Sequence, residues 1–313
     1  MSSPTFMQSS KRQRQLGILV RYLIAFILIV FALFPVVWII SASINPLNSL
    51  ATQTLIPENA TLGNYETLLT ENEFSRVYPF TDWMLNSLKI ASITTVVSVA
   101  ITTLAAYSFS RFRFRQRENM LRSILLIQVF PALLAMVAVF LLIQQIGDVM
   151  PVVDRDLPLL GVPAGSPIIG LNTHTGLILV YLGGAMGINI WLMKGYFDSI
   201  PREIDESAMV DGATHWQIFS RLLLPLMRPI IVVVGILTFI FVYGDFVMAR
   251  ILLKTTSQYP VTVGLWQFTS DQFSQQWGLF AAGALMAALP IMIVYLLLQD
   301  QIVGGLTQGS VKG

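Results

Sequence analysis

The chain of 313 residues contains no cysteine, only two histidines, and charged side chains at 12% of its positions. The absence of cysteine excludes disulfides, thiolate metal sites and cysteine nucleophiles. The two histidines, His174 and His215, stand far apart in the sequence and do not indicate a metal site. A typical soluble domain is about 25% charged, so the charge content is half the usual value. The formal net charge of +2 gives no indication of nucleic-acid binding.

Hydrophobic residues make up 55% of the chain, and the mean hydropathy is +0.69. The apolar runs are long enough to cross a bilayer as helices and do not alternate as membrane strands would. The sequence therefore predicts an all-α integral membrane protein with a domain at 16–303, a mobile N-terminus at 1–15 and a tail at 304–313. The six predicted spans cover residues 16–43, 86–109, 121–145, 175–197, 229–251 and 279–303.

Most of the 19 Lys and Arg residues fall on one side of these six spans. Cytoplasmic loops carry the excess of Lys and Arg, so both termini are predicted to be cytoplasmic. The polar segment at 201–225 then lies in the cytoplasm between the fourth and fifth spans. Three loops, at 44–85, 146–174 and 252–278, are predicted to lie outside.

The polar segment (201–225) carries signals for two short helices. Ser199 can cap the first helix, Pro201 suits its first turn, and three acids follow that favour the positive end of a helix dipole. Gly212 interrupts the pattern, because glycine accepts a positive φ, and Thr214 can cap a second helix. The sequence predicts two helices joined at an elbow (residues 211–214).

The second of these helices has an apolar stripe formed by Trp216, Phe219, Leu222 and Leu223. Pro225 and Pro229 are predicted to end it before the next span. A rigid protrusion for a partner protein is one interpretation of the polar segment. An amphipathic helix lying in the lipid headgroups is the other, and the pattern alone does not separate them.

A spaced motif in the polar segment resembles a known pattern. Glu206-Ser207-Ala208 is followed after three residues by Gly212, and after nine more by Leu222-x-Leu224-Pro225. This resembles the EAA motif of ABC-importer membrane subunits, written E-A-A, three residues, G, nine residues, I-x-L-P. The chain departs from it at Ser207 and Leu222, both mild changes.

Other stretches are similar to the smaller membrane subunit of the maltose/maltodextrin importers. The similarity covers nearly the whole chain and departs at 152–166, which resembles an insertion. The stretches that carry it are residues 128–132, 170–174, 181–184, 194–197, 211–214 and 305–313.

The resemblance implies a type I ABC-importer permease fold and half of a heterodimeric pore in the bacterial cytoplasmic membrane. The implied partners are a second membrane permease subunit, two copies of a cytoplasmic ATPase subunit, an extracytoplasmic sugar-binding protein and the lipid bilayer. The chain lacks a G-x-x-x-x-G-K-[ST] loop, so it is not expected to hydrolyse ATP. No cofactor is expected on this chain, and ATP with Mg would bind the partner ATPase subunits.

The resemblance also implies roles for three sets of residues. The residues implied to couple to the ATPase are Glu206, Ser207, Ala208, Asp211, Gly212, Ala213, Trp216, Phe219, Leu222, Leu224 and Pro225. The implied ATPase-contacting tail is Gly309, Ser310, Val311, Lys312 and Gly313. The implied loop facing the binding protein includes Ser270, Asp271, Gln272, Phe273 and Gln276.

Each set has a plainer alternative. The aromatic side chains could pack against the chain's own spans, and a tail of small polar residues is often disordered. Aromatic residues in the outer loop also suit an ordinary interfacial belt, although aromatic and amide side chains together suit a sugar system.

Three polar side chains are predicted at membrane depth: Asp245, Gln128 and Asn189. A carboxylate facing lipid is costly, so Asp245 should face the pore or a partner, either as a proton relay or in hydrogen bonds within the helix bundle. Prolines at 35, 131 and 290 are predicted to kink their spans.

Two other classes of protein remain as alternatives. A stand-alone secondary transporter predicts related halves with broken helices and ionisable groups near the midplane. No such halves are recognisable in this sequence. A membrane enzyme predicts a cluster of acids or histidines at one membrane face, and the acids here are scattered.

Overall fold

The computed structural model describes residues 5–47, 54–270 and 275–308, and every regular element in these ranges is helical. The chain forms two compact units, Met1–Thr70 with Phe268–Met286 and Glu71–Gln267 with Ala287–Gly313. The helices before the polar segment are α1 (Thr5–Ser43), α2 (Gly63–Leu69), α3 (Glu73–Val77), α4 (Phe80–Arg111), α5 (Arg117–Val129), α6 (Ala132–Val149) and α7 (His174–Ser199). The remainder are α8 (Glu203–Val210), α9 (His215–Gln217), the π-helical turn η1 (Ile218–Leu223), α10 (Leu224–Leu226), α11 (Arg228–Gly244), α12 (Val247–Leu252), the 3₁₀ turn η2 (Thr256–Gln258), α13 (Val261–Ser270) and α14 (Trp277–Gln308).

Four helices in the described ranges are long and apolar enough to cross a membrane: α1, α4, α7 and α14. The count reaches six if each of two bent helix pairs is one span. The predicted spans 86–109 and 175–197 fall within α4 and α7. Helix α1 begins at Thr5, well before the predicted start at residue 16, and α14 continues past residue 303 to Gln308.

The predicted third span, 121–145, is not one continuous helix. Segments Arg117–Val129 and Leu134–Val149 meet at a bend of 108°. Phe130 and Pro131 both have extended backbones, with ψ of 128° and 118°. Proline lacks an N–H and pushes the residue before it out of the α region, so the helix breaks here instead of kinking.

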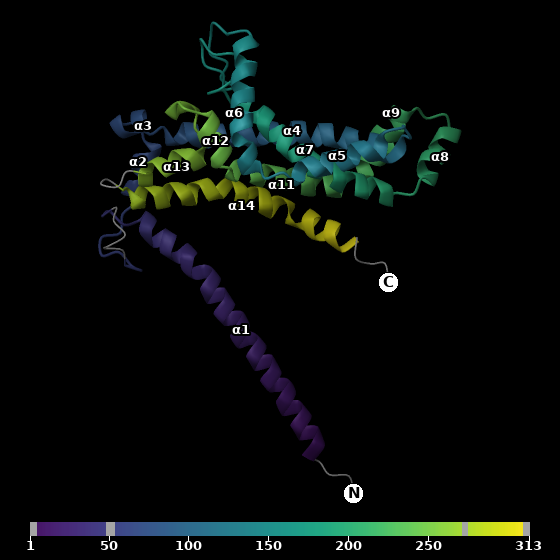
Figure 1. The fold of residues 1–313 in the computed structure, drawn as a ribbon. Coiled ribbons are helices and arrows are strands. Elements are labelled where there is room, and N and C mark those ends of the chain that lie inside the picture. The colour runs from purple at the N-terminus through teal and green to yellow at the C-terminus, as the bar shows by residue number, and fades with distance from the viewer. Residues whose placement is uncertain (1–4, 48–53, 271–274, 309–313) are drawn as a thin grey trace. The chain divides into compact units, whose positions relative to one another are not determined.

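Helices α4, α7 and α11 lie side by side and form the core of the larger unit (Figure 1). The buried face of α4 repeats small and hydroxyl side chains at one-turn spacing, with Thr94, Ser98, Thr102 and Ala106 all fully buried. Small residues let membrane helices approach closely, and a hydroxyl can donate to the backbone of its own helix. Thr102 Oγ1, for example, donates to Ser98 O at 2.7 Å.

In the smaller unit, the end of α1 is joined to α2 by polar contacts. Asn64 Nδ2 donates to Ser43 O at 2.9 Å and to Asn45 O at 3.1 Å, and Tyr65 Oη donates to Ser43 Oγ at 2.7 Å. The apolar stretch of α1 itself has no buried residues in this chain. An apolar helix without internal contacts must be covered by lipid or by another subunit.

Candidate functional site

The first helix of the polar segment, α8, forms as predicted but is capped differently. Ser199 is the last residue of α7, and its Oγ donates to Tyr196 O at 2.7 Å, so the prediction that it caps α8 was wrong. Arg202 occupies the N-cap position without a side-chain cap, and Pro201 precedes the helix. The first turn of α8 contains Glu203, Asp205 and Glu206, where carboxylates stabilise a helix N-terminus.

The elbow at 211–214 has the predicted geometry. Gly212 has φ of +83°, a conformation that costs other residues roughly 1–2 kcal/mol. A Cβ atom added at Gly212 would meet nothing within 4 Å, so open space surrounds this position. Thr214 Oγ1 accepts from Gln217 N at 3.3 Å, while Gln217 Oε1 accepts from Thr214 N at 2.8 Å. This capping box starts the second helix and fixes the angle of the elbow.

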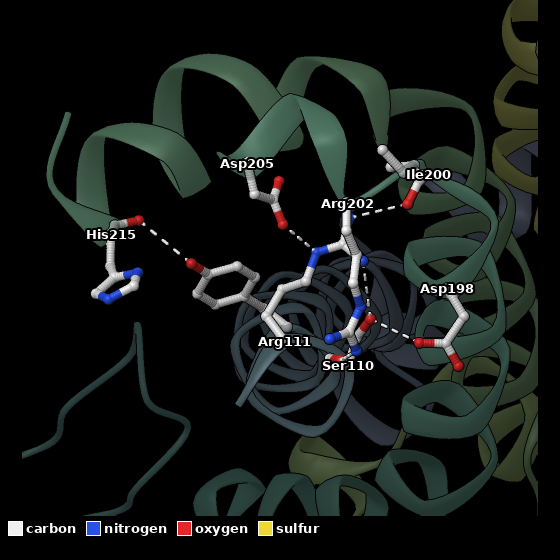
Figure 2. Close-up of polar contacts among 8 residues, drawn as sticks. Ser110, Arg111, Asp198, Ile200, Arg202, Asp205 and His215 are labelled. Carbon is white, nitrogen blue, oxygen red and sulfur yellow. Dashed lines mark hydrogen bonds and ion pairs between the residues drawn. The ribbon is translucent and has the colours of Figure 1, made fainter. Parts of the chain in front are cut away.

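An ion pair joins α8 to the end of α4. Arg111 Nε lies 2.5 Å from Asp205 Oδ2, and the two side chains are only 7% and 12% exposed (Figure 2). Asp205 Oδ1 is buried without a hydrogen-bond partner among the described residues, so Arg111 alone balances this carboxylate. Arg111 Nη2 also donates to Ile200 O at 3.1 Å. One guanidinium therefore connects α4, the α7–α8 connection and α8.

A second set of contacts extends this network to α7. Arg202 Nη2 donates to Ser110 O at 3.0 Å, and Ser110 Oγ donates to Asp198 Oδ1 at 2.6 Å (Figure 2). Asp198 also pairs with Lys194, with Nζ 2.5 Å from Oδ2. The end of α4 thereby holds α8 and Arg202, and is itself bound to Asp198 of α7. A displacement of α8 would be transmitted to both α4 and α7.

The apolar stripe of the second helix divides into an inward and an outward part. Phe219 and Leu223 are buried, and the Phe219 ring lies 4.9 Å from the Tyr107 ring of α4. Trp216 is 65% exposed and leans on Phe219 at a ring separation of 5.4 Å. Packing within the chain, the alternative interpretation, therefore holds for Phe219. Leu222 is 38% exposed, and Trp216 remains available to a partner.

The second helix ends at Leu226, between Pro225 and Pro229 and before the next span, as predicted. The helical path runs from His215 to Leu226 and then bends by 73° into α11. Pro225 lies inside that path, just after η1, and Pro229 begins α11. In η1 the N–H of Leu224 reaches back to Phe219 O, and this wider π turn accommodates a proline that has no N–H to donate.

The other residues of the implied coupling set lie around the elbow. Ser207 is exposed and Ala208 is buried against the core. Asp211 is exposed, while Ala213 and Leu224 are partly buried. A cavity of about 120 Å³ lies beside the contact between α8 and the end of α4. Its lining includes Glu206, Met209 and His215.

The three intramembrane polar residues do not meet at one site. Asp245 is not inside a helix but at the break between α11 and α12, with ψ of 134°. Its Oδ2 accepts from Tyr181 Oη at 2.8 Å and from Met248 N at 3.0 Å. Asn189 donates to Thr238 Oγ1 at 3.0 Å, and Gln128 donates to Gly184 O at 3.2 Å. Hydrogen bonding within the helix bundle thus accounts for each of these side chains.

The implied ATPase-contacting tail and three of the five residues implied to face the binding protein lie outside the described residues. These are Gly309–Gly313 and Asp271–Phe273. Ser270 ends α13, and Gln276 N donates to Phe268 O at 2.8 Å. Within the described ranges, no group of His, Asp and Glu side chains suits a metal ion.

Sequence reasoning missed Arg111 and Ser110, which anchor the polar segment. Arg111 contributed to the sequence analysis only through the Lys and Arg bias that sets the membrane orientation. Among the arginines at 111, 113, 115 and 117, Arg111 is the one that belongs to α4, where it is the final residue. A basic residue in the last turn is a weak signal, since it also fits the helix dipole. Its partner Asp205 suits the N-terminal end of a helix dipole equally well, so no local signal pairs the two residues.

Comparison with known proteins identifies the family of this chain. Residues 98–303 match the model of the family described as binding-protein-dependent transport system inner membrane component. The chain is 41% identical over 288 residues to the maltose/maltodextrin transport system permease protein MalG of Vibrio vulnificus (strain YJ016), covering 90% of this chain and 91% of that protein. It is 36% identical over 303 residues to the galactooligosaccharides transport system permease protein GanQ of Bacillus subtilis (strain 168), covering 97% and 98%.

A solved structure shares the fold. It is described as a bacterial ABC transporter involved in the import of the acidic polysaccharide alginate, and the similarity has a TM-score of 0.73 at 22% identity over 96% of this chain and 98% of that one. The matched family segment contains the C-terminal half of α4, all of α7 and the whole polar segment. The chain therefore belongs to the family of binding-protein-dependent transport system inner membrane components.

Proposed function

We propose that this chain is the membrane permease subunit of an ATP-driven oligosaccharide importer, and that its polar segment couples the membrane helices to a cytoplasmic ATPase. The two relatives named above carry maltose/maltodextrin and galactooligosaccharides in their names, so an oligosaccharide is the proposed cargo. The protein would lie in the bacterial inner membrane, with both termini in the cytoplasm. This chain would form half of the pore with a second permease subunit.

One observation carries the coupling role: exposed apolar side chains flank the elbow, while the helix before it is held firmly to α4. Val210 is 87% exposed, Met209 46% and Trp216 65%. Exposed apolar side chains on an otherwise polar protrusion mark a protein interaction site. The Arg111–Asp205 pair and the Arg202–Ser110 contact hold the base to α4.

The mechanism follows from that arrangement. Two ATPase subunits would bind ATP and Mg, and their closure would move a docked elbow. Because α8 is fixed to α4, and through it to α7, its displacement becomes a rigid-body rotation of those helices, which is alternating access. The binding energy of ATP biases the pore only if docking contacts differ between the two states. This chain would supply the lever and the pore wall, without hydrolysing ATP. The tail at 309–313 would add a second ATPase contact.

The test substitutes Gly212 and measures sugar uptake and ATP hydrolysis by the reconstituted transporter. Gly212→Asp is expected to uncouple hydrolysis from uptake while the protein stays assembled in the membrane. Gly212→Asn is the matched variant, because asparagine tolerates a positive φ but still projects into the space at the tip. Loss of coupling in both variants supports docking at the elbow. Undiminished uptake in both would refute the coupling role.

A further inference from the structure

Helix α12 lies at the end of the α4–α7–α11 bundle opposite the polar segment (Figure 1), and two cations belong to it and to the residues just after it. They are Arg250 on α12 and Lys254 just after it, and the stretch 246–270 that contains them has no Asp or Glu. Extracytoplasmic loops of membrane proteins are normally poor in Lys and Arg. Under the proposed function this end is extracytoplasmic, so an uncompensated pair of cations there needs an explanation.

Arg250 is held by aromatic rings and not by an acid. Its Cζ lies 5.2 Å from the centre of the Trp266 ring and 6.0 Å from the Tyr259 ring. The side chain is exposed and makes no ion pair or hydrogen bond with the described residues. Stacking fixes the plane of a guanidinium and leaves its edge of N–H donors free. Such an edge suits bidentate recognition of a carboxylate.

Lys254 lies beyond the end of α12, and its ammonium group is also near an aromatic ring. Its Nζ lies 5.8 Å from the Phe140 ring of α6. Its backbone is fixed by Asn172, whose Oδ1 accepts from Lys254 N and from Thr255 N, both at 2.9 Å. Asn172 has φ of +59°, which asparagine tolerates better than most residues. Tyr259 Oη donates to Lys254 O at 2.9 Å and closes this loop.

A further contact ties this loop to the start of α7. His174 Nε2 lies 2.9 Å from Gln258 O, and His174 N donates to Gly161 O at 3.0 Å. A Cβ atom at Gly161 would overlap the His174 ring, so the loop at 150–173 packs closely here. The surface that presents Arg250 and Lys254 is therefore preformed, which lowers the entropic cost of binding a partner.

We infer that Arg250 and Lys254 form a cationic platform that docks carboxylates of the extracytoplasmic sugar-binding protein. The inference rests on the proposed function, which puts both termini in the cytoplasm and therefore this end outside. The partner comes from the family, whose members are components of binding-protein-dependent transport systems. A protein carboxylate fits better than the sugar itself, because a neutral sugar provides no counter-charge. Charged groups at the rim of an interface mainly change the rate at which two proteins associate and how strongly that rate depends on salt.

The experiment uses the complete transporter in lipid nanodiscs, titrated with its purified, sugar-loaded binding protein while ATP hydrolysis is followed. The Arg250→Ala/Lys254→Ala variant is expected to raise the half-saturating concentration of binding protein about three- to tenfold, as for two exposed ion pairs. The maximal hydrolysis rate should not change, and the dependence on salt should weaken. Arg76→Ala is the matched control, since Arg76 is an exposed cation on α3 without an aromatic partner.

The outcomes separate the inference from the proposed function. Wild-type transporter that does not respond to the binding protein at all would contradict the proposed function. A responsive wild type with an unchanged half-saturating concentration in the double variant would overturn the platform alone. An equal shift in Arg76→Ala would also overturn it, because net charge would then explain the effect. A changed sugar preference at constant half-saturation would reassign the platform to the sugar.

Discussion

The ion pair between Arg111 and Asp205 gives the sharpest prediction about the polar segment. Substituting Asp205 with alanine leaves Arg111 charged in a site where it is 7% exposed. Removing one partner of a buried ion pair typically costs about 3–5 kcal/mol. We take about 3 kcal/mol, because Arg111 keeps its hydrogen bond to Ile200 O at 3.1 Å. That cost falls on the docking of α8 and not on the whole chain.

The expected result is local opening of α8. A loss of about 3 kcal/mol raises the population of the open form roughly 150-fold, since about 1.4 kcal/mol corresponds to a factor of ten. Hydrogen exchange of backbone amides at 203–217, measured by mass spectrometry on the assembled transporter, reports this population. Amides in the middle of α4 and α7 should exchange at wild-type rates. ATP hydrolysis should continue while sugar uptake falls, because the lever is no longer attached to α4.

Two variants make the reasoning refutable. Glu203→Ala removes an exposed carboxylate from the same first turn and should leave exchange nearly unchanged. The double variant Arg111→Met/Asp205→Leu replaces the pair with apolar side chains of similar size and should restore most of the protection, as such replacements often do. Wild-type exchange at 203–217 in Asp205→Ala would refute the role of the ion pair. So would an equal loss of protection in Glu203→Ala.

Two further predictions concern packing and hydrogen bonding outside the polar segment. Gly264→Ala would place a Cβ atom inside the fully buried Trp83 indole and should destabilise the protein by about 1–3 kcal/mol. The loss would appear as a lower thermal unfolding temperature in detergent. The same change at Gly183, which has open space around it, should be neutral. Asp245→Asn keeps an oxygen that can accept from Tyr181, and a membrane hydrogen bond averages about 0.6 kcal/mol, so uptake should stay within about threefold of wild type at every pH tested. A pH-dependent collapse of uptake in Asp245→Asn would favour the proton-relay interpretation instead.

The helices and the elbow were predictable because their signals are local. Apolar runs of sufficient length identify α4 and α7, and Gly212 with Thr214 specifies a turn and a cap within a few residues. Local predictions failed where two local signals competed. The sequence predicts that Ser199 caps α8, but its hydroxyl donates to Tyr196 O within α7. The sequence predicts a kink at Pro131, but the helix breaks completely there.

The sequence by itself determined a membrane protein with long apolar helices, a polar segment bent at Gly212 and a motif shared with ABC-importer membrane subunits. Only the tertiary structure decided which charges pair, which aromatic ring faces inward and where the polar side chains in the membrane find partners. Arg111 meets Asp205, Phe219 meets Tyr107, and Asp245 meets Tyr181 across segments far apart in the chain. Local patterns constrain backbone conformation within a turn or two, whereas these contacts depend on how separate helices pack against one another.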